Sequence, residues 1–459
     1  MTTKRDELST DRKEGWNRRD FFKLAGTTAA AGALLTMPSW ARANRPPTPG
    51  TETPTLENVQ DAFILDENRV YMNIGTTGSM PKHVLDEYDR LNRAVARDPW
   101  GMEGEFGDTW PYSTAMREIL APQFGATTEE FVITGNTTMG MNIILGGLDF
   151  KKNDVILTTN HEHVAATSPM ALLRDRMGVK IVEIPLPTDF MASEKEIMAR
   201  FEKYLDSYRP KLLVFSHITY TTGIRLPASK ICDMANKYGV PTLVDGAHAS
   251  GMLDLDFHEM GCTFYAASGH KWQCGPGGTG ILYVRNADDN DPALWPILSS
   301  LYEYWQNPDY GMGTALQYHG NPNYPAMQAL VESCNFWEKI GRKDIEKRVL
   351  NLSAYCKKML GRTFSWAPLY CPNDPSISSG LTTFNPFKKD TGNGDLVHEF
   401  REKLRKEHGF VIRYTHFKEN ENATDDTYAL RISTHLFNDY DQIDDLMYAM
   451  WQVYNDTRY

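Results

Sequence analysis

Short apolar runs alternate with longer amphipathic stretches through the first two thirds of the chain. Continuous apolar strands separated by helices predict a mainly parallel sheet that is covered on both faces. The predicted strands are 131–134, 155–159, 180–186, 212–216 and 241–245, and the predicted helices are 82–97, 114–124, 165–177, 193–207 and 227–238. Beyond residue 325 the pattern predicts a smaller α+β unit, with one long helical stretch at 325–361, strands at 380–384, 411–413 and 428–432, and a helix at 395–407.

Polar residues stand where the predicted strands end. They are the turn after Thr134, then His163, Thr219, Asp245 and His248. In parallel sheets covered by helices, ligands bind beyond the carboxyl ends of the strands. The sequence therefore predicts a binding site at this edge of the sheet.

A single lysine, Lys271, lies between an apolar and aromatic segment at 262–268 and a glycine-rich run at 275–280. Apolar surroundings disfavour the charged form of a lysine, and an uncharged amine can attack a carbonyl carbon. The alternative is a turn lysine at the end of a strand. Lys271 follows Asp245 by enough residues for one further strand on the same sheet.

Two further stretches carry candidate chemistry. Asn136, Thr137 and Thr138 follow a predicted strand and open a helix, so unpaired helix N–H groups can bind an anion there. On this local signal alone, a plain helix N-cap is the better interpretation. The His161-Glu162-His163 motif can bind zinc, but the sequence offers no third ligand with matching placement, and a histidine ring stacked on a flat cofactor is better supported.

Composition excludes other classes of protein. The net charge is −11, so a nucleic-acid partner has no electrostatic support. The six cysteines form no CxxC pair and no metal-ligand spacing, which indicates small buried side chains and not a disulfide framework. They are Cys232, Cys262, Cys274, Cys334, Cys356 and Cys371.

Several of these motifs together resemble one enzyme family. The motifs are Asn136-Thr137-Thr138, His163, Asp245-Gly246-Ala247-His248, Ser268-Gly269-His270-Lys271 and Leu430-Arg431-Ile432-Ser433. From about Tyr71 onward the chain is similar to the class V aminotransferases, and to their isopenicillin N epimerase-like branch. The resemblance implies pyridoxal 5′-phosphate (PLP) as cofactor and fold type I, an α/β fold with a mainly parallel seven-stranded sheet flanked by helices. It implies a large PLP-binding domain at 59–325 and a small α+β domain at 326–459.

The resemblance gives each matching residue an expected role. Lys271 is expected to bond covalently to PLP and to move protons at the substrate Cα. Asp245 is expected to pair with the pyridine nitrogen and so make the ring an electron sink. His163 is expected to stack on the ring, and His248 to lie near its phenolic oxygen or its phosphate.

The phosphate group of PLP has its own expected partners. Asn136, Thr137, Thr138, Ser268 and His270 are expected to bind it beside a helix N-terminus. In this family a threonine of a second subunit completes the phosphate site, and the sequence points to Thr314. The resemblance therefore implies a homodimer with shared active sites.

Arg431 resembles the family arginine that binds the substrate α-carboxylate, and Tyr220 is expected in the substrate pocket. The implied reaction acts on an amino acid or an amino-acid-containing metabolite through an external aldimine and a Cα carbanion. Transamination, epimerisation and elimination remain open. Cysteine desulfurases of this fold carry a loop cysteine that the segment 411–428 lacks, which disfavours that activity. A non-catalytic binding protein that keeps the fold is the competing class.

The N-terminus resembles a twin-arginine export signal. Arg18 and Arg19 precede two aromatic residues, a weakly apolar run at 24–37 and an A-x-A site that ends at Ala43. An amphipathic helix is the alternative. We expect a signal peptide at 1–43, a flexible leader at 44–58, and export of the folded chain to the periplasm by the twin-arginine machinery. This chain also resembles the periplasmic PLP enzymes of pyoverdine maturation.

Overall fold

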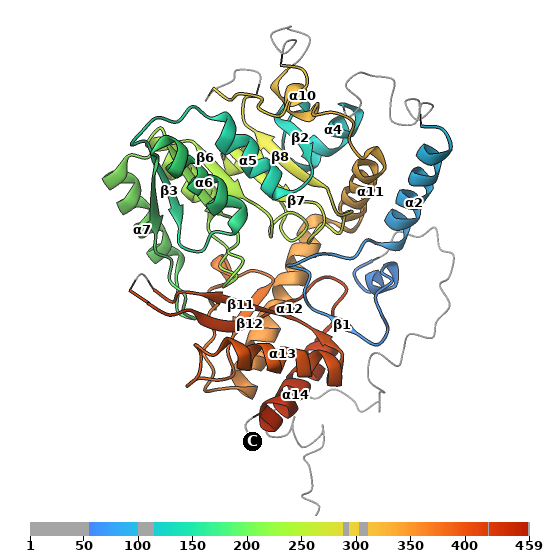
Figure 1. Ribbon diagram of the computed structural model, residues 1–459. Coiled ribbons are helices and arrows are strands. Elements are labelled where there is room, and N and C mark those ends of the chain that lie inside the picture. Colours follow the sequence, from blue (N-terminus) through green and yellow to red (C-terminus); the bar gives the residue numbers. More distant parts are fainter. Residues whose placement is uncertain (1–54, 100–113, 288–292, 303–310, 421, 458–459) are drawn as a thin grey trace, which may run out of the picture.

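The computed structural model describes residues 55–99, 114–287, 293–302, 311–420 and 422–457 of the 459-residue chain. A seven-stranded sheet with the strand order β2-β8-β7-β6-β5-β3-β4 forms its centre (Figure 1). All neighbouring strands are parallel except those that pair with β8. The strands are β2 (Phe131–Thr134), β3 (Val155–Thr159), β4 (Lys180–Ile184), β5 (Leu212–Ser216), β6 (Thr242–Asp245), β7 (Phe264–Ser268) and β8 (Gly280–Val284). The predicted fold is confirmed.

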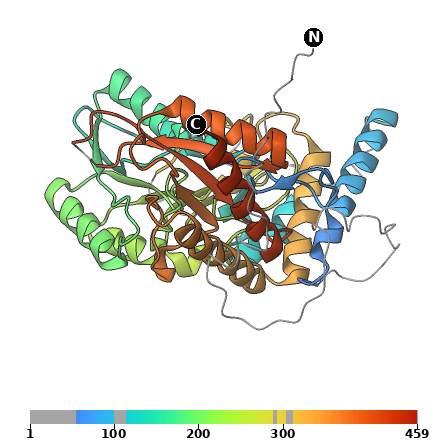
Figure 2. The same ribbon diagram turned by 90° about the horizontal axis from the view of Figure 1, so that it is seen from below.

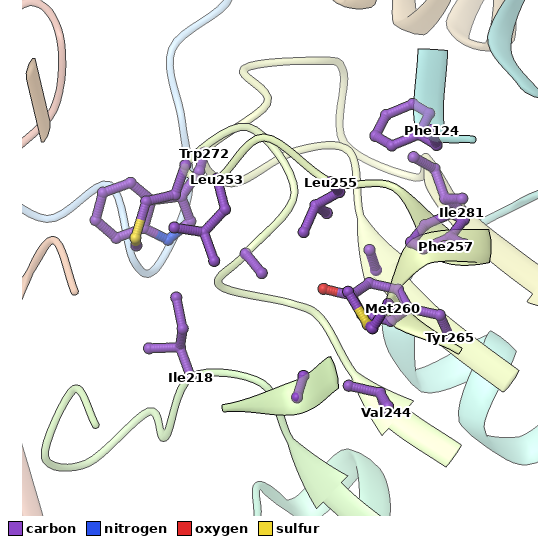
Figure 3. Packing of buried hydrophobic residues seen from close by; sticks show 14 of the residues in the cluster. Phe124, Ile218, Val244, Leu253, Leu255, Phe257, Met260, Tyr265, Trp272 and Ile281 are labelled. Atoms are coloured by element: carbon purple, nitrogen blue, oxygen red, sulfur yellow. The ribbon is translucent and has the colours of Figure 1, made fainter. Parts of the chain in front are cut away.

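Both faces of this sheet are buried, as a parallel sheet requires. Alternate residues of one strand belong to two different hydrophobic clusters: Val244 packs in the first, and Leu243 in the second. Figure 3 shows part of the first cluster, where the ring centroids of Phe257 and Tyr265 are 4.7 Å apart.

Helices cover the two faces and continue into the C-terminal part of the chain. They are α2 (Lys82–Arg97), α4 (Thr114–Leu120), α5 (Thr137–Gly147), α6 (Val164–Met177), α7 (Glu194–Tyr208), α8 (Ala228–Lys237), α9 (Phe257–Met260), α10 (Met312–Gln317), α11 (Tyr324–Ile340), α12 (Arg342–Thr363), α13 (Gly394–His408) and α14 (Tyr440–Thr457). Short 3₁₀ turns lie at η2 (Val59–Ala62), η3 (Ala121–Phe124), η4 (Thr128–Glu130) and η5 (Pro375–Ile377). Within the described residues, no helix is both long enough and apolar enough to cross a membrane.

A second, antiparallel sheet has the order β11-β12-β9 and packs against α12, α13 and α14. Seen from below, this sheet and the C-terminal helices lie across the lower end of the large sheet (Figure 2). A parallel pair, β1 with β10, joins the start of the described chain to this unit. These strands are β1 (Val70–Tyr71), β9 (Leu381–Phe384), β10 (Phe410–Val411), β11 (Arg413–Phe417) and β12 (Thr427–Ser433).

The predicted helical stretch at 325–361 is helical except at one residue, which divides it in two. The stretch forms α11 and α12, which are separated at Gly341 with φ of +99°, a backbone conformation that ends a right-handed helix. The predicted strand 411–413 is likewise two strands, β10 and β11, with Ile412 between them.

The two hydrophobic cores meet along α12. Residues of α11 and the first turns of α12, such as Val349, pack with the large sheet, and from Leu352 onward α12 packs with the small sheet. The change of core therefore falls within α12, later than the predicted domain boundary at 325, and that boundary stays a prediction.

Two helical glycines give opposite expectations for the same substitution. A Cβ on Gly140 in α5 would lie 2.8 Å from the Cβ of Ala266 in β7, whereas a Cβ on Gly361 in α12 meets nothing within 4 Å. Helix propensity favours alanine at both positions by up to about 1 kcal/mol. We expect Gly140→Ala to lower the free energy of unfolding by about 1–3 kcal/mol because of overpacking, and Gly361→Ala to raise it slightly. Urea titration followed by circular dichroism measures both, and equal shifts would contradict close packing of α5 on β7.

Candidate active site

Strand ends bring the predicted polar residues to one edge of the large sheet. β3, β5, β6 and β7 run parallel and end at Thr159, Ser216, Asp245 and Ser268. The small sheet lies against the same edge, since Arg431 of β12 donates a hydrogen bond of 2.7 Å to the carbonyl of Tyr220 beyond β5.

Lys271 lies in the turn that follows β7, and two segments fix its backbone. Its carbonyl accepts a hydrogen bond from the N–H of Cys274, and the carbonyl of the preceding residue, His270, accepts one of 2.7 Å from the N–H of Gly78. A Cβ on Gly78 would lie 2.2 Å from the Lys271 carbonyl oxygen, so this close approach requires glycine. The backbone of Lys271 is therefore fixed, whereas its Nζ atom forms no hydrogen bond or ion pair with the described residues.

Burial lowers the pKa of Lys271 to about 8. The Asp245 carboxylate acts in the opposite direction, and the charges of Arg431 and Arg413 add to the lowering. Asp245 itself is 4% exposed; burial raises its pKa, and the hydrogen bond of 2.9 Å from the N–H of Ala247 opposes that rise. The lysine therefore carries roughly a tenth of its amine in the neutral, nucleophilic form at pH 7, far more than an ordinary lysine does.

Two histidines of the site are neutral. His163 caps α6, where its Nδ1 accepts a hydrogen bond from the N–H of Ala165, and its ring meets the Tyr220 ring edge-on at 5.1 Å between centroids. His248 accepts a hydrogen bond of 3.2 Å from the indole N–H of Trp272 at Nδ1. Burial, with the Lys271 charge second, lowers the pKa of His163 to about 4 and that of His248 well below its usual range.

The start of α5 lies against the end of β7. The hydroxyl groups of Thr137 and Ser268 are 2.7 Å apart. The side chain of Asn136 accepts the N–H of Met139, so it serves as the helix N-cap. Thr138 is exposed, and its side chain does not join this contact. His270 is half-buried, and its Nδ1 is a buried atom without a hydrogen-bond partner among the described residues.

Arg431 is 2% exposed, yet none of the described acidic side chains pairs with it. Its two terminal nitrogens donate to the Tyr220 carbonyl and, at 3.3 Å, to the Thr76 hydroxyl, while Nε has no partner. Burial lowers its pKa to about 9, and the charge of Arg413 adds to this. A buried guanidinium without a carboxylate is strongly disfavoured unless an anion joins it.

Thr314 lies apart from these residues in the described chain. It is 5% exposed, and its hydroxyl contacts Arg117 Nη2 at 2.8 Å and Glu129 Oε1 at 3.0 Å. A hydroxyl with two partners in its own chain is poorly placed to reach another subunit. The homodimer and the role of Thr314 in it stay predictions.

For three further residues, the sequence alone predicts no role in the site. Thr76 and Arg413 carry no local motif, and only the pairing of β11 with β12 brings Arg413 beside Arg431. Glu162 belongs to the His-Glu-His motif; its carboxylate accepts hydrogen bonds from the hydroxyls of Thr159 and Ser216, and burial raises its pKa to about 7. Among the described residues no cluster of three metal-ligating side chains occurs.

The residues at this edge fit PLP. A lysine with a lowered pKa can bond to the aldehyde, a buried carboxylate can meet the pyridine nitrogen, and a helix N-terminus with hydroxyl groups can bind the phosphate. The unpartnered Nδ1 of His270 and Nε of Arg431 are consistent with groups that meet a cofactor and its substrate.

Comparisons with known proteins agree with this fit. The Aminotransferase class-V family model matches residues 70–446. Isopenicillin N epimerase of Amycolatopsis lactamdurans is 26% identical over 412 residues, which cover 86% of this chain and 98% of the relative. A probable cysteine desulfurase of Halalkalibacterium halodurans is 27% identical over 348 residues, 73% of this chain and 82% of the relative. A structure of the cystine C-S lyase C-DES, a variant with glycine covalently linked to its PLP cofactor, has a TM-score of 0.70 at 23% identity and covers 84% of this chain and 96% of that chain.

The fold and the site define a fold type I PLP enzyme. The chain belongs to the class V aminotransferase family, whose cofactor is PLP and whose typical substrates resemble amino acids.

The apoprotein offers a direct measurement of the Lys271 amine. Because its pKa is about 8 instead of the usual 10.5, we expect labelling of Lys271 by an amine-selective reagent to rise with pH and reach half its maximum near pH 8. Asp245→Asn removes the charge that favours the ammonium form, so the midpoint should move to lower pH. Asp254→Asn, a change at an exposed carboxylate, is the control and should leave it in place. Peptide mass spectrometry measures the labelling. A wild-type midpoint near pH 10.5 would contradict the lowered pKa of Lys271.

Proposed function

We propose that this chain is an exported PLP-dependent enzyme of the isopenicillin N epimerase-like branch, which acts at the Cα of an amino acid or amino-acid-containing metabolite. One observation carries the proposal: Lys271 and Asp245 share a strand-end site with Arg431, a buried guanidinium that no described acid neutralises. A binding protein that only kept the fold would need neither the lysine nor the unpaired arginine.

The roles of the residues follow from their chemistry. PLP, when bound, withdraws electrons from the Cα of an amine attached to it. Asp245 would accept the pyridine N–H, and its carboxylate would keep that nitrogen protonated. The neutral ring of His163 would stack on the cofactor, while Lys271 Nζ would bond to it and then remove or return a proton at Cα.

The phosphate would lie at the start of α5. The N–H groups of the first turn point there, the hydroxyl groups of Thr137 and Ser268 already face each other, and His270 supplies a further ring nitrogen. Asn136 would contribute by fixing the helix start. Thr138, which is exposed, and Thr314, which is held by Arg117, have weaker support in the described chain.

Arg431 would bind the α-carboxylate. Its planar guanidinium suits a bidentate contact, and the Tyr220 carbonyl and the Thr76 hydroxyl hold it in one orientation. A fixed carboxylate would set which bond at Cα stands across the cofactor ring. The Tyr220 ring, edge-on to His163, would form one wall of the pocket.

Transamination, epimerisation and β-elimination share these residues and all fit the proposal. Desulfuration through a protein persulfide fits less well, although similar relatives include probable cysteine desulfurases. That route needs an accessible cysteine thiol, and all six cysteines of this chain are buried. Burial also raises the pKa of the thiols closest to the site, such as Cys274, which disfavours thiolate formation.

The decisive experiment compares two lysines whose pKa values are lowered. We expect protein loaded with PLP to absorb visible light, to carry the cofactor on the Lys271 peptide after borohydride reduction, and to exchange the Cα hydrogen of a substrate amino acid in D₂O. Lys271→Ala should lose the covalent cofactor and the exchange. Lys357→Met is the control, because burial also lowers the pKa of Lys357, but its Nζ donates to the Pro372 carbonyl in the small unit. Retention of covalent PLP by Lys271→Ala would contradict the proposal. Cofactor binding by the wild-type protein without exchange of the Cα hydrogen would favour a binding protein.

Export by the twin-arginine route is the second part of the proposal. Residues 1–43 lie outside the described part of the chain, so the support is the sequence order of paired arginines, apolar run and A-x-A site. This route carries folded proteins, which suits a chain that acquires its cofactor in the cytoplasm. The periplasm is therefore the proposed location.

Replacement of Arg18 and Arg19 by lysine tests this route. The charge of the segment is unchanged, whereas recognition of paired arginines is lost, so we expect the protein to stay in the cytoplasmic fraction as an uncleaved precursor. Fractionation and immunoblotting measure the distribution. An unchanged periplasmic amount would show that export, if it occurs, does not use the paired arginines.

A further inference from the structure

Two arginines stand directly opposite each other on the small sheet. In the antiparallel pair β11 and β12, Arg413 is the partner of Arg431. Opposite residues of such a pair point to the same face of the sheet, with their Cβ atoms about 5 Å apart. Arg431 is buried and Arg413 is exposed, so the two side chains form an inner and an outer position on one face.

That face looks toward the candidate site. Beside Arg431, Thr383 of β9 shares the face and donates a hydrogen bond of 2.8 Å to the carbonyl of Thr221, which lies beyond the end of β5. Farther along β11, the Phe417 ring packs at 5.7 Å from His161, the first residue of the His-Glu-His motif. Arg413 thus begins a row of side chains that covers the edge where Lys271 lies.

The pair carries positive charge that the described residues do not neutralise. Like charges directly opposite each other on a sheet are destabilising, and no described carboxylate forms an ion pair or hydrogen bond with either arginine. The acid nearest along the strands, Asp426, pairs instead with His416 at 3.0 Å, and His416 points to the other face of β11. The charge of Arg413 also lowers the pKa of Lys271 and His163, so Arg413 lies within electrostatic range of the site.

We propose that Arg413 binds a second carboxylate, at the far end of the substrate side chain, while Arg431 binds the α-carboxylate. The substrate class is then an amino acid, or an amino-acid unit of a larger metabolite, with an acidic side chain. This inference rests on the proposed function and narrows its substrate. A guanidinium matches a carboxylate with two parallel hydrogen bonds, and two anions remove the repulsion between the paired arginines.

The effect of the ligand's side-chain charge on binding can be measured with pairs of ligands that have nearly the same shape. With PLP-loaded protein at low ionic strength, isothermal titration measures the dissociation constants of L-glutamate and L-glutamine, and of L-aspartate and L-asparagine. We expect the acid of at least one pair to bind about tenfold more tightly than its amide. Arg413→Gln should abolish that ratio and leave amide binding unchanged, and Arg413→Lys should keep part of it.

Lys418→Gln is the matched control. Lys418 is an exposed cation just beyond β11, and no described residue pairs with it, so its removal changes net charge equally without changing the proposed contact. An equal loss of selectivity in Lys418→Gln would show a general field effect and would overturn the role of Arg413. Preference for O-phosphoserine over both acids would overturn the carboxylate assignment.

Failure of this inference is distinguishable from failure of the proposed function. If Cα hydrogen exchange depends on Lys271 but the acids and the amides bind equally well, only the role of Arg413 is wrong. If no amino acid binds, glutarate and its monoamide, which need no α-amino group, are titrated in the same way. Equal binding of these two, or no binding of either, also overturns the second carboxylate site.

Discussion

Positive charge gathered where two sheets meet is the constraint on which this structure depends. Lys271, Arg431 and Arg413 share the region where the small sheet meets the strand ends, and Asp245 is the acid among the described residues that acts directly on Lys271. Burying charge without neutralisation is costly, so such a region persists only when the rest of the fold holds it in place. Backbone contacts supply that support: the Tyr220 carbonyl fixes one arginine, and the Gly78 segment fixes the turn that carries the lysine.

The lysine and the carboxylate of this site do not separate the possible chemistries within the family. An amine of lowered pKa beside a buried carboxylate serves any reaction that begins by breaking a bond at Cα, and similar relatives include an isopenicillin N epimerase and a probable cysteine desulfurase. The surface that closes the site from the small sheet includes strand β11, on which Thr415 and Phe417 are buried, Arg413 is exposed, and there is no thiol. If Arg413 binds a second carboxylate as proposed, substrate selection depends on β11 more than on the lysine.

Much of this site could be predicted because strand ends have a sequence signal. Asp245, His163 and Ser268 each follow or end an apolar run, and the parallel sheet brings such positions together. Thr137 and Thr138 are adjacent in sequence, and only the phase of α5 decides that the first faces Ser268. The break at Gly341 was missed because helix-forming residues flank it and one glycine is tolerated in a helix. Arg413 required the register of β11 with β12, which depends on contacts between distant segments and not on local pattern.

The pairing of β1 with β10 has a consequence for the order in which the protein assembles. Thr76, near the start of the described chain, meets Arg431, which is 355 residues later, and Val70 pairs with Phe410. During synthesis the large sheet can form early from its own neighbouring strands, but its active edge stays open until the last strands leave the ribosome. Completion of the cofactor site is thus a late event, because the site closes only after the C-terminal strands have been synthesised and have folded against the large sheet.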